Sequence, residues 1–353
     1  MVERGVDVLL LSVGADLPYL TGYEAMPLER LTMLVVPAGD AATMVVPRLE
    51  VPRVVEHPEV FSVQGWDETE SPIALVAGLA KGASVAAIGD TTWARFLVDL
   101  IEAMPATEFR KASEVTGPLR QRKDAAEIEA LAAAGAAADR VAVQLQSGQI
   151  PLVGRTEAEV SKDLSRRLVA EGHDRVNFAI VAAGSNAASP HHHAGARVIE
   201  TGDVVLCDFG GTMAGYCSDI TRCVVAGGAQ PPANVSEAYA VLHEAQRAAV
   251  AAAAVGVPCE EVDATARRII SEAGFGDFFI HRTGHGIGMQ EHEDPYIVAG
   301  NTQPLAPGHA FSVEPGIYVP GEFGLRLEDI VVATDDGPRP LNAVDHSLVT
   351  VNV

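Results

Sequence analysis

The stretch Val204-Val-Leu-Cys-Asp-Phe-Gly-Gly-Thr-Met-Ala-Gly-Tyr-Cys-Ser-Asp-Ile-Thr-Arg222 is the most informative part of the chain for its fold. Its pattern is typical of two apolar strands joined by a glycine-containing turn near Met213 and Ala214. A hairpin centred there places Asp208 roughly opposite Asp219, with Cβ atoms about 5 Å apart. Two carboxylates at that distance repel each other unless a proton or a cation lies between them. The alternative is that one aspartate belongs to a turn and the other to the exposed end of a strand.

A second stretch repeats this arrangement nearer the end of the chain: Phe311-Ser-Val-Glu-Pro-Gly-Ile-Tyr-Val-Pro-Gly-Glu-Phe-Gly-Leu-Arg-Leu-Glu-Asp-Ile-Val-Val332. A turn around Pro320 and Gly321 places Glu314 roughly opposite Glu328. Apolar residues flank both glutamates, and glutamate is rarely buried without a partner. Because two separate hairpins each offer a facing pair of carboxylates, a cation site is favoured over two unrelated surface pairs.

Histidines are concentrated in two further segments. The stretch Phe279-Ile-His-Arg-Thr-Gly-His-Gly-Ile-Gly-Met-Gln-Glu-His-Glu-Asp-Pro295 contains His281, His285 and His292. Its glycines allow backbone and side chains to approach a site closely. Three histidines in so short a segment favour a functional site over three unrelated structural residues. The stretch Gly184-Ser-Asn-Ala-Ala-Ser-Pro-His-His-His193 is either a further part of that site or a polar loop.

These side chains suit divalent cations. Four carboxylates and one neutral imidazole carry four negative charges, which balance two divalent ions. Oxygen ligands with one imidazole favour Mn, Co or Fe, with Zn as an alternative. Two such ions can activate a water and polarise a carbonyl, which is the equipment for amide hydrolysis.

Composition excludes several other classes of protein. The 353 residues include 25 Lys+Arg and 47 Asp+Glu, which gives a formal net charge of −22. Such a chain lacks the basic surface that nucleic acids or anionic membranes require. The longest apolar run, around residues 248–258, is far shorter than the roughly 20 residues of a membrane span.

Cysteine usage and the N-terminus predict a cytoplasmic location. The four cysteines form neither a CxxC pair nor a dense disulfide framework, so a reducing cytoplasm is expected. Glu3 and Asp7 near the start are not typical of a signal peptide. Cys217 lies two residues before Asp219, so we also consider a thiol beside the metal site, against the alternative of a packed small residue.

The order of expected elements indicates two domains. In the first third, strands at residues 6–12, 31–36, 43–46 and 84–88 and a helix at 92–103 give an α/β pattern. The polar segment 120–124 then marks a domain boundary. An Ala-rich helix is expected at 125–146, and a capping box at Thr156 and Glu159 begins another that ends near 171. Further helices are expected at 235–254 and 260–273.

At these residues the chain resembles the pita-bread metallopeptidases, the family of prolidase, aminopeptidase P and methionine aminopeptidase. The run His281-Arg-Thr-Gly-His-Gly-Ile-Gly, the Glu-Pro-Gly at 314–316 and the Arg-Leu-Glu-Asp at 326–329 match in order and spacing, and the likeness covers essentially the whole chain. It implies an α/β creatinase-type N-terminal domain over residues 1–120. It also implies an α+β pita-bread catalytic domain over residues 121–353.

The resemblance implies a role for each site residue. Five positions match metal ligands: Asp208, Asp219, His285, Glu314 and Glu328. Those matching Asp219 and Glu328 bridge the two ions, and the one matching Glu314 is also the general base. Substrate-side or supporting roles fall on His191, His281, His292, Arg326, Tyr318 and Thr221.

The same resemblance implies a proline-specific peptidase. Creatinase has lost the metal ligands, whereas all five are present here, and methionine aminopeptidase lacks the N-terminal domain. The expected activity is that of an Xaa-Pro dipeptidase, working as a homodimer on short proline-containing peptides. Tyr296 stands where several compact prolidases have an arginine that binds the dipeptide carboxylate, so aminopeptidase P remains an alternative. A lyase or a non-enzymatic binding protein on the same scaffold are more distant ones.

Overall fold

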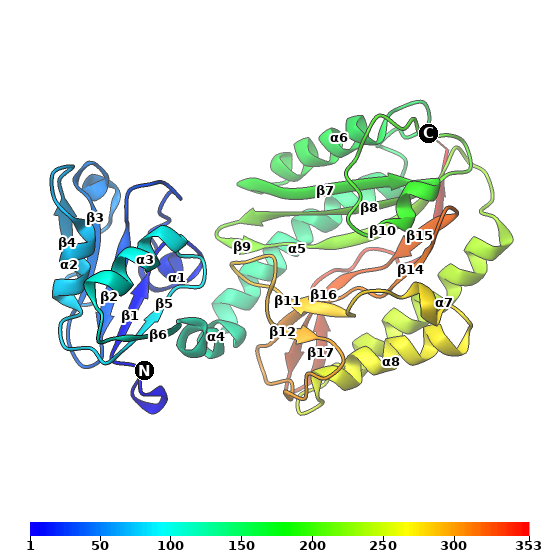
Figure 1. Ribbon diagram of the computed structural model, residues 1–353. Helices are drawn as coiled ribbons and strands as arrows, with labels where there is room; N and C mark the ends of the chain where they lie inside the picture. The colour runs from blue at the N-terminus through cyan, green and yellow to red at the C-terminus, as the bar shows by residue number, and fades with distance from the viewer. Residues whose placement is uncertain (353) are drawn as a thin grey trace. The chain divides into compact units, whose positions relative to one another are not determined.

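The computed structural model describes residues 1–352 (Figure 1). The chain forms two compact units: the first covers Met1–Arg120 and the second begins at Gln121. No helix in the described part of the chain combines the length and apolarity needed to cross a membrane.

The first unit is built around a six-stranded mixed sheet in the order β4-β3-β2-β1-β5-β6. All four residues of β1 are buried, as expected for a strand covered on both faces. Val8 and Leu10 pack with one group of buried residues and Leu9 and Leu11 with another. The elements of this unit are β1 (Val8–Leu11), α1 (Asp16–Thr21), β2 (Met33–Pro37), β3 (Ala42–Pro47), β4 (Phe61–Trp66), α2 (Pro72–Leu79), β5 (Val85–Ile88), α3 (Ala94–Ala103), β6 (Glu108–Lys111) and α4 (Ser113–Gln121).

The strands and the helix expected for this unit are present, with slightly different ends. The sequence pattern missed β4, β6, α1, α2 and α4. Strand β6, with the sequence Glu-Phe-Arg-Lys, has no buried residue, and β4 contains Gln64 and Gly65. Polar edge strands of this kind lack the apolar pattern by which strands are recognised.

The first sheet of the second unit has the order β18-β10-β8-β7, with β9 paired to β8. Because strand side chains alternate between faces, Val205, Cys207 and Phe209 of β8 pack in the group of buried residues that includes α5 and α6. Leu206 packs in the group that includes α7 and α8. The strands are β7 (Arg175–Ala183), β8 (Val204–Met213), β9 (Tyr216–Cys217), β10 (Ile220–Ala226) and β18 (Val349–Val351).

Four helices complete the layers of this unit: α5 (Ala125–Gln146), α6 (Glu157–Ala170), α7 (Ala233–Ala252) and α8 (Cys259–Glu272). All four were expected from the sequence. The capping box predicted for α6 is present, since Thr156 Oγ1 accepts from Glu159 N and the Glu159 carboxylate accepts from Thr156 N. Asp124 and Glu127 form the same arrangement at the start of α5.

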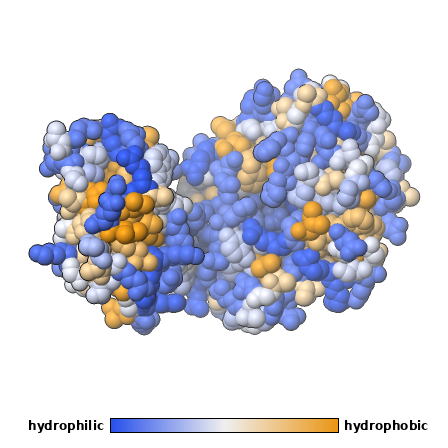
Figure 2. Space-filling model, viewed as in Figure 1, coloured by the Kyte–Doolittle hydropathy of each residue, from blue (hydrophilic) through white to orange (hydrophobic). Residues whose placement is uncertain are grey.

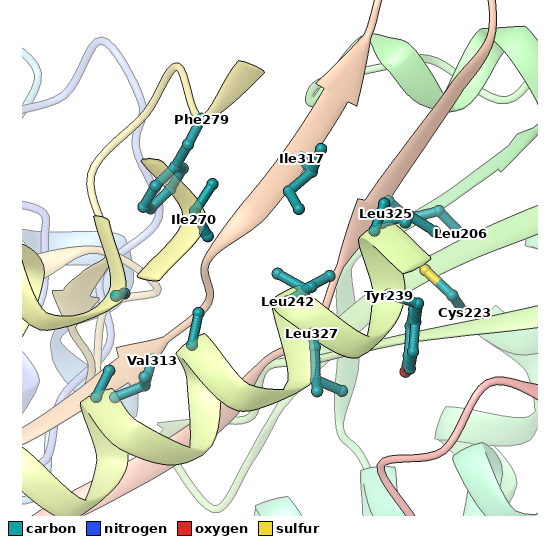
Figure 3. Packing of buried hydrophobic residues seen from close by; sticks show 14 of the residues in the cluster. Leu206, Cys223, Tyr239, Leu242, Ile270, Phe279, Val313, Ile317, Leu325 and Leu327 are labelled. Carbon is teal, nitrogen blue, oxygen red and sulfur yellow. The ribbon is translucent and has the colours of Figure 1, made fainter. Parts of the chain in front are cut away.

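The second sheet of this unit has the order β12-β11-β13-β16-β17, beside a separate hairpin of β14 and β15 (Figure 1). Tyr239 and Leu242 of α7 belong to the same group of buried residues as Leu325 and Leu327 (Figure 3). The strands are β11 (Gly284–Gly286), β12 (Glu293–Ile297), β13 (Ala310–Val313), β14 (Gly316–Val319), β15 (Phe323–Arg326), β16 (Asp329–Thr334) and β17 (Gly337–Pro340).

Hydrophilic residues dominate the face drawn in Figure 2, with apolar residues gathered in smaller patches. A net charge of −22 agrees with this surface. Asp208, Asp219 and Glu328 are instead buried within the second unit.

Candidate metal centre

The hairpin of β8 and β10 carries Asp208 and Asp219, but the two aspartates do not face each other directly. Its turn consists of Ala214 and Gly215, both with positive φ, one residue later than expected. Asp208 therefore pairs with Thr221. The same register places Asp219 opposite Gly210, diagonally from Asp208 on the same face of the sheet. The expected face was right and the expected pairing was wrong by two residues.

Gly210 is required between the two aspartates. It pairs with Phe178 of β7. A Cβ at position 210 would lie 2.1 Å from the Ser218 carbonyl oxygen and 2.9 Å from the Phe178 ring. Glycine thus allows an aromatic side chain to lie directly beside the carboxylates.

The second hairpin places Glu314 opposite Glu328. The strand pairing is interrupted at these two residues, but the pairs on both sides keep the same register. Val313 pairs with Asp329 on one side of the break, and Gly316 pairs with Arg326 on the other. At this interruption the backbone N–H groups of the two glutamates donate to other segments of the chain. Glu314 N donates to the Thr283 carbonyl oxygen at 2.8 Å, and Glu328 N donates to that of Thr221 at 3.3 Å.

These two hydrogen bonds bring the glutamates close to the aspartates and to His285, which lie on other segments of the chain. Thr221 is the residue opposite Asp208, and Thr283 lies two residues before His285. The break in the hairpin therefore joins one glutamate to the aspartate hairpin and the other to the histidine segment.

His285 directs one ring nitrogen at the carboxylates. Its Nδ1–H donates to the Gly286 carbonyl oxygen at 3.1 Å, so Nε2 is the ring nitrogen that faces the carboxylates. Nε2 lies 3.2 Å from Glu314 Oε1 and 3.7 Å from Asp219 Oδ2. Ser312 fixes this geometry, because its hydroxyl accepts from His285 N and donates to Glu314.

All five expected ligands and the four expected histidine and arginine positions line one cavity of about 480 Å³. One donor atom each of Asp219, His285 and Glu328 lies within 4.8 Å of the other two. The full lining is Phe178, Ile180, Pro190, His191, Asp208, Asp219, His281, Arg282, His285, Glu291, His292, Glu314, Arg326 and Glu328.

The carboxylates of this cavity are incompletely satisfied. Asp208 Oδ1 and Asp219 Oδ1 are buried without a hydrogen-bond partner in the described residues. Burial, followed by the charges of Glu328 and Asp208, raises the pKa of Asp219 well above its ordinary value. Burial and the charges of Glu314 and Asp208 raise the pKa of Glu328 in the same way. These buried like charges, with orphaned oxygens, fit the ligand chemistry of divalent cations.

Glu314 differs from its neighbours. Burial opposes its ionisation, but the hydrogen bond and charge of His285 outweigh burial and lower the pKa of Glu314 to about 2. Glu314 is therefore ionised at neutral pH.

Arg326 connects the carboxylates to the cavity wall. It donates from Nη2 to Asp208 at 2.5 Å, from Nε to Thr221 Oγ1 at 3.1 Å and from Nη1 to Tyr318 Oη at 2.8 Å. Thr221 in turn donates to Glu328 at 2.6 Å. Tyr318 donates to His281 Nε2 at 2.9 Å, while His281 Nδ1–H donates to the Arg282 carbonyl oxygen. Both ring nitrogens of His281 are thus engaged within the protein.

His292 and His191 also lie on the cavity wall. The ring centroid of His292 is 4.0 Å from that of His285. Burial and the positive charges of His285 and Arg282 lower the pKa of His292 to about 4, so its imidazole is neutral at pH 7. The loop of His191 is held by its neighbour His192, whose Nε2 lies 2.8 Å from the buried carboxylate of Glu157.

Several residues of the site were missed by sequence reasoning. Phe178, Ile180 and Pro190 form an apolar part of the wall, and nothing in their local pattern marks them. Arg282 lies inside the quoted histidine segment and was passed over. Glu157, in the first turn of α6, also accepts from Ala183 N and Gly195 N, a role that needs the tertiary structure to be seen.

Cys217 does not belong to the metal centre. It lies in β9, outside the cavity lining, and packs with a group of buried residues that includes Leu131 and Ile287. Burial raises the pKa of its thiol to about 11. The alternative of a packed small residue is therefore favoured for Cys217.

An α/β unit followed by a two-sheet unit, with a buried cluster of carboxylates and one histidine that could hold a metal ion, fits a metal-dependent enzyme. The metallopeptidase family M24 model matches residues 126–335, and the creatinase/prolidase N-terminal domain model matches residues 1–122. The chain therefore belongs to the M24 metallopeptidases. The resemblance and the fold class expected from the sequence are both confirmed.

Individual relatives agree with this assignment. The chain is 44% identical to the probable dipeptidase PepE of Mycobacterium tuberculosis, over 99% of this chain and 94% of that protein. The prolidase structure from Thermococcus sibiricus is 37% identical, with a TM-score of 0.91, covering 99% of this chain and 95% of that one. The X-Pro aminopeptidase structure from Thermotoga maritima is 30% identical, with a TM-score of 0.84 and 99% of each chain covered.

Proposed function

We propose that this enzyme is a two-metal Xaa-Pro dipeptidase that hydrolyses the bond before proline in short peptides. The observation that carries the proposal is a single cavity in which orphaned carboxylate oxygens lie beside an apolar wall. The acidic part suits cations. Phe178, Ile180 and Pro190 suit the ring of a proline, whose tertiary amide lacks an N–H.

The ligands for two divalent cations in this proposal are Asp208, Asp219, His285, Glu314 and Glu328. Four carboxylates and one neutral imidazole balance the charge of two such ions, and this donor set favours Mn, with Co, Fe or Zn as alternatives. When bound, the ions supply Lewis acidity toward the scissile carbonyl and the attacking water.

The chain's own side chains then have distinct roles. Glu314, ionised because His285 lowers its pKa, accepts a proton from the attacking water at a carboxylate oxygen and returns it to the proline nitrogen. Neutral His292 donates a hydrogen bond to the carbonyl oxygen as charge develops there. His191 contacts the substrate from the opposite loop. Arg326 orients Asp208, and through Tyr318 it also orients His281.

The remaining parts of the proposal concern organisation. Residues 1–120 form the N-terminal domain and residues 121–353 the catalytic domain of a cytoplasmic homodimer. The four free, buried cysteines support a reducing compartment. The dimer rests on the family resemblance, and sedimentation of the purified chain tests it.

A competition assay tests the activity. Manganese-loaded enzyme receives Ala-Pro, Ala-Pro-Ala and Ala-Leu together, and products are followed by mass spectrometry with a chelated control. The proposal predicts metal-dependent cleavage of Ala-Pro ahead of the other two. Preferential cleavage of the tripeptide would assign the chain to the X-Pro aminopeptidases instead, and cleavage of none would favour a different reaction on this scaffold.

A further inference from the structure

Arg282 lines the cavity, and it has no role in the proposed catalytic mechanism. The backbone on both sides of it is fixed. Arg267 of α8 donates to the His281 carbonyl oxygen at 2.8 Å, and the buried carboxylate of Asp263 accepts from Thr283 N at 3.0 Å. The guanidinium is therefore carried by a rigid segment rather than by a loose loop.

The charge of Arg282 is available for a ligand. Within residues 1–352, no hydrogen bond or ion pair of its guanidinium is found. Arg326, the other arginine of the cavity, donates to Asp208, Thr221 and Tyr318 and has no comparable freedom. Of the two arginines in the cavity, only Arg282 can offer a two-pronged donor to an anion.

Tyr296 holds this guanidinium in place without using its N–H groups. The Arg282 Cζ atom lies 4.3 Å from the centroid of the Tyr296 ring, a cation–π contact. The ring is itself anchored. Tyr296 belongs to β12, where its neighbour Ile297 pairs with Gly284, and its carbonyl oxygen accepts from Asn301 Nδ2 at 2.7 Å.

The position of Arg282 relative to the metal ligands suits a short substrate. The His292 ring contacts that of His285, and Arg282 lines the same cavity as these two histidines. Two extended residues span at most about 7 Å, so a dipeptide held at the carboxylates is short enough for its free end to meet another group of the same cavity wall.

We propose that Arg282, held on the ring of Tyr296, binds the free C-terminal carboxylate of a dipeptide and makes the enzyme selective for dipeptides over longer peptides. A guanidinium matches a carboxylate with two parallel N–H···O bonds. In a longer peptide a neutral amide stands at that point, so the charge-assisted bonds are lost. The identity of the cleaved bond rests on the proposed function; the carboxylate contact does not.

The test compares an acid with its amide. Purified, manganese-loaded enzyme is assayed on Ala-Pro and on Ala-Pro amide, which differ only in the terminal charge. Arg282→Gln is expected to lower kcat/KM for Ala-Pro roughly 10- to 100-fold, mainly through KM, because charge-assisted hydrogen bonds are lost. The ratio of acid to amide should collapse toward one. Arg268→Gln makes the same charge change at an exposed position of α8 and should keep the wild-type ratio.

Variants of Tyr296 test its role as a positioning residue. Tyr296→Phe keeps the ring and should behave as wild type. Tyr296→Leu removes the cation–π contact and should raise KM for Ala-Pro about 2- to 5-fold, with little change in kcat and little change on the amide. Equal effects of Tyr296→Leu on acid and amide would contradict the positioning role.

Direct binding separates this proposal from the proposed function. Titration calorimetry of Ala-Pro and Ala-Pro amide gives the acid-to-amide affinity ratio whether or not the peptide is cleaved. If Ala-Leu is hydrolysed in preference to Ala-Pro, the proline specificity fails and the ratio is measured on Ala-Leu and its amide. An unchanged ratio in Arg282→Gln, on the peptide that binds, overturns the assignment of Arg282.

Discussion

Glu328 and Asp329 are adjacent, almost fully buried carboxylates in opposite surroundings. Asp329 accepts from Arg222 at 2.7 Å and Gln246 at 2.9 Å and lies 2.5 Å from His346 Nε2. Burial alone would raise its pKa, but the His346 hydrogen bond and the charge of Arg222 outweigh it and lower the pKa of Asp329. Glu328 accepts from the Thr221 hydroxyl, but burial and the charges of Glu314 and Asp208 outweigh that bond and the charge of Arg326 and raise its pKa.

This difference separates a structural carboxylate, Asp329, from a candidate metal ligand, Glu328. Asp329 is satisfied by the protein itself, so nothing further is needed there. Glu328 lies in a group whose charges the protein leaves uncompensated, which is the expected property of a cation site. The two groups are physically joined, because Arg222 also donates to the Glu328 carbonyl oxygen at 2.6 Å. The structural cluster therefore holds the backbone of the ligand in place.

The largest effect is expected from Glu328→Gln. Activity should fall about 10³-fold or more, because a metal ligand is lost. The metal-free protein should nevertheless become more stable by about 1–2 kcal/mol, or roughly 2–8 °C in Tm, since one of the mutually repelling carboxylates is removed. Calorimetry of chelated wild type and variant measures this. A destabilised metal-free variant would contradict the contrast drawn between the two carboxylates.

Asp329→Asn is the matched substitution at the next residue and should act in the opposite direction. It leaves the fully buried Arg222 without its charged partner, which costs about 3–5 kcal/mol of stability. Tm should fall with or without metal. Arg222→Met removes the other partner, and a loss of stability there as well would show that the pair acts together. If the Tm of Asp329→Asn equalled that of wild type, Asp329 would not be a stabilising structural carboxylate, and the difference from Glu328 would be lost.

The pH dependence sharpens the same comparison. A carboxyl whose folded pKa is raised contributes stability below its unfolded value, and that contribution is lost as pH rises through the folded pKa. The stability gained by Glu328→Gln in metal-free protein should therefore grow between pH 5 and pH 7.5. The folded pKa of Asp329 is lowered instead, so Asp329 is ionised throughout this range and its substitution should still destabilise at pH 5. Melting curves of both variants at the two pH values measure this, and a gain that shrinks with rising pH would be contrary to the account.

His292→Ala should give the smallest of these effects. It removes a neutral hydrogen-bonding group from the cavity wall and leaves the five ligands in place. Turnover should fall roughly 10- to 100-fold, with metal content near that of wild type. Metal analysis of the purified variant is the control, and loss of the metal would show that His292 supports the site rather than the substrate.

Sequence reasoning predicted which candidate metal ligands share one cavity because four of them lie on two hairpins with clear alternation. The Glu314 and Glu328 pair was placed correctly, since the turn at Pro320 and Gly321 sets the register of both ladders. The Asp208 and Asp219 pair was placed two residues off. The turn is formed by Ala214 and Gly215, both with positive φ, one residue later than the expected turn at Met213 and Ala214.

Other parts of the site could not be predicted because they depend on tertiary contacts. The sequence does not show which arginine of the cavity can bind a ligand. The hydrogen bonds of Arg326 to Asp208, Thr221 and Tyr318 are seen only in the structure. The contrast between Glu328 and Asp329 depends on Gln246 and His346, which come from distant elements. Residues adjacent in the sequence predict neither the free guanidinium of Arg282 in the described part of the chain nor the different surroundings of Glu328 and Asp329.

Metal stoichiometry tests the central claim most directly. Chelated wild-type protein is titrated with Mn²⁺ at pH 7.5, bound metal per chain is counted after gel filtration, and Glu328→Gln and Asp329→Asn are treated in the same way. The account predicts two ions per wild-type chain, two in folded Asp329→Asn and fewer in Glu328→Gln. Full occupancy in Glu328→Gln, or no stoichiometric binding by the wild type, would contradict the claim that these unsatisfied carboxylates form a cation site.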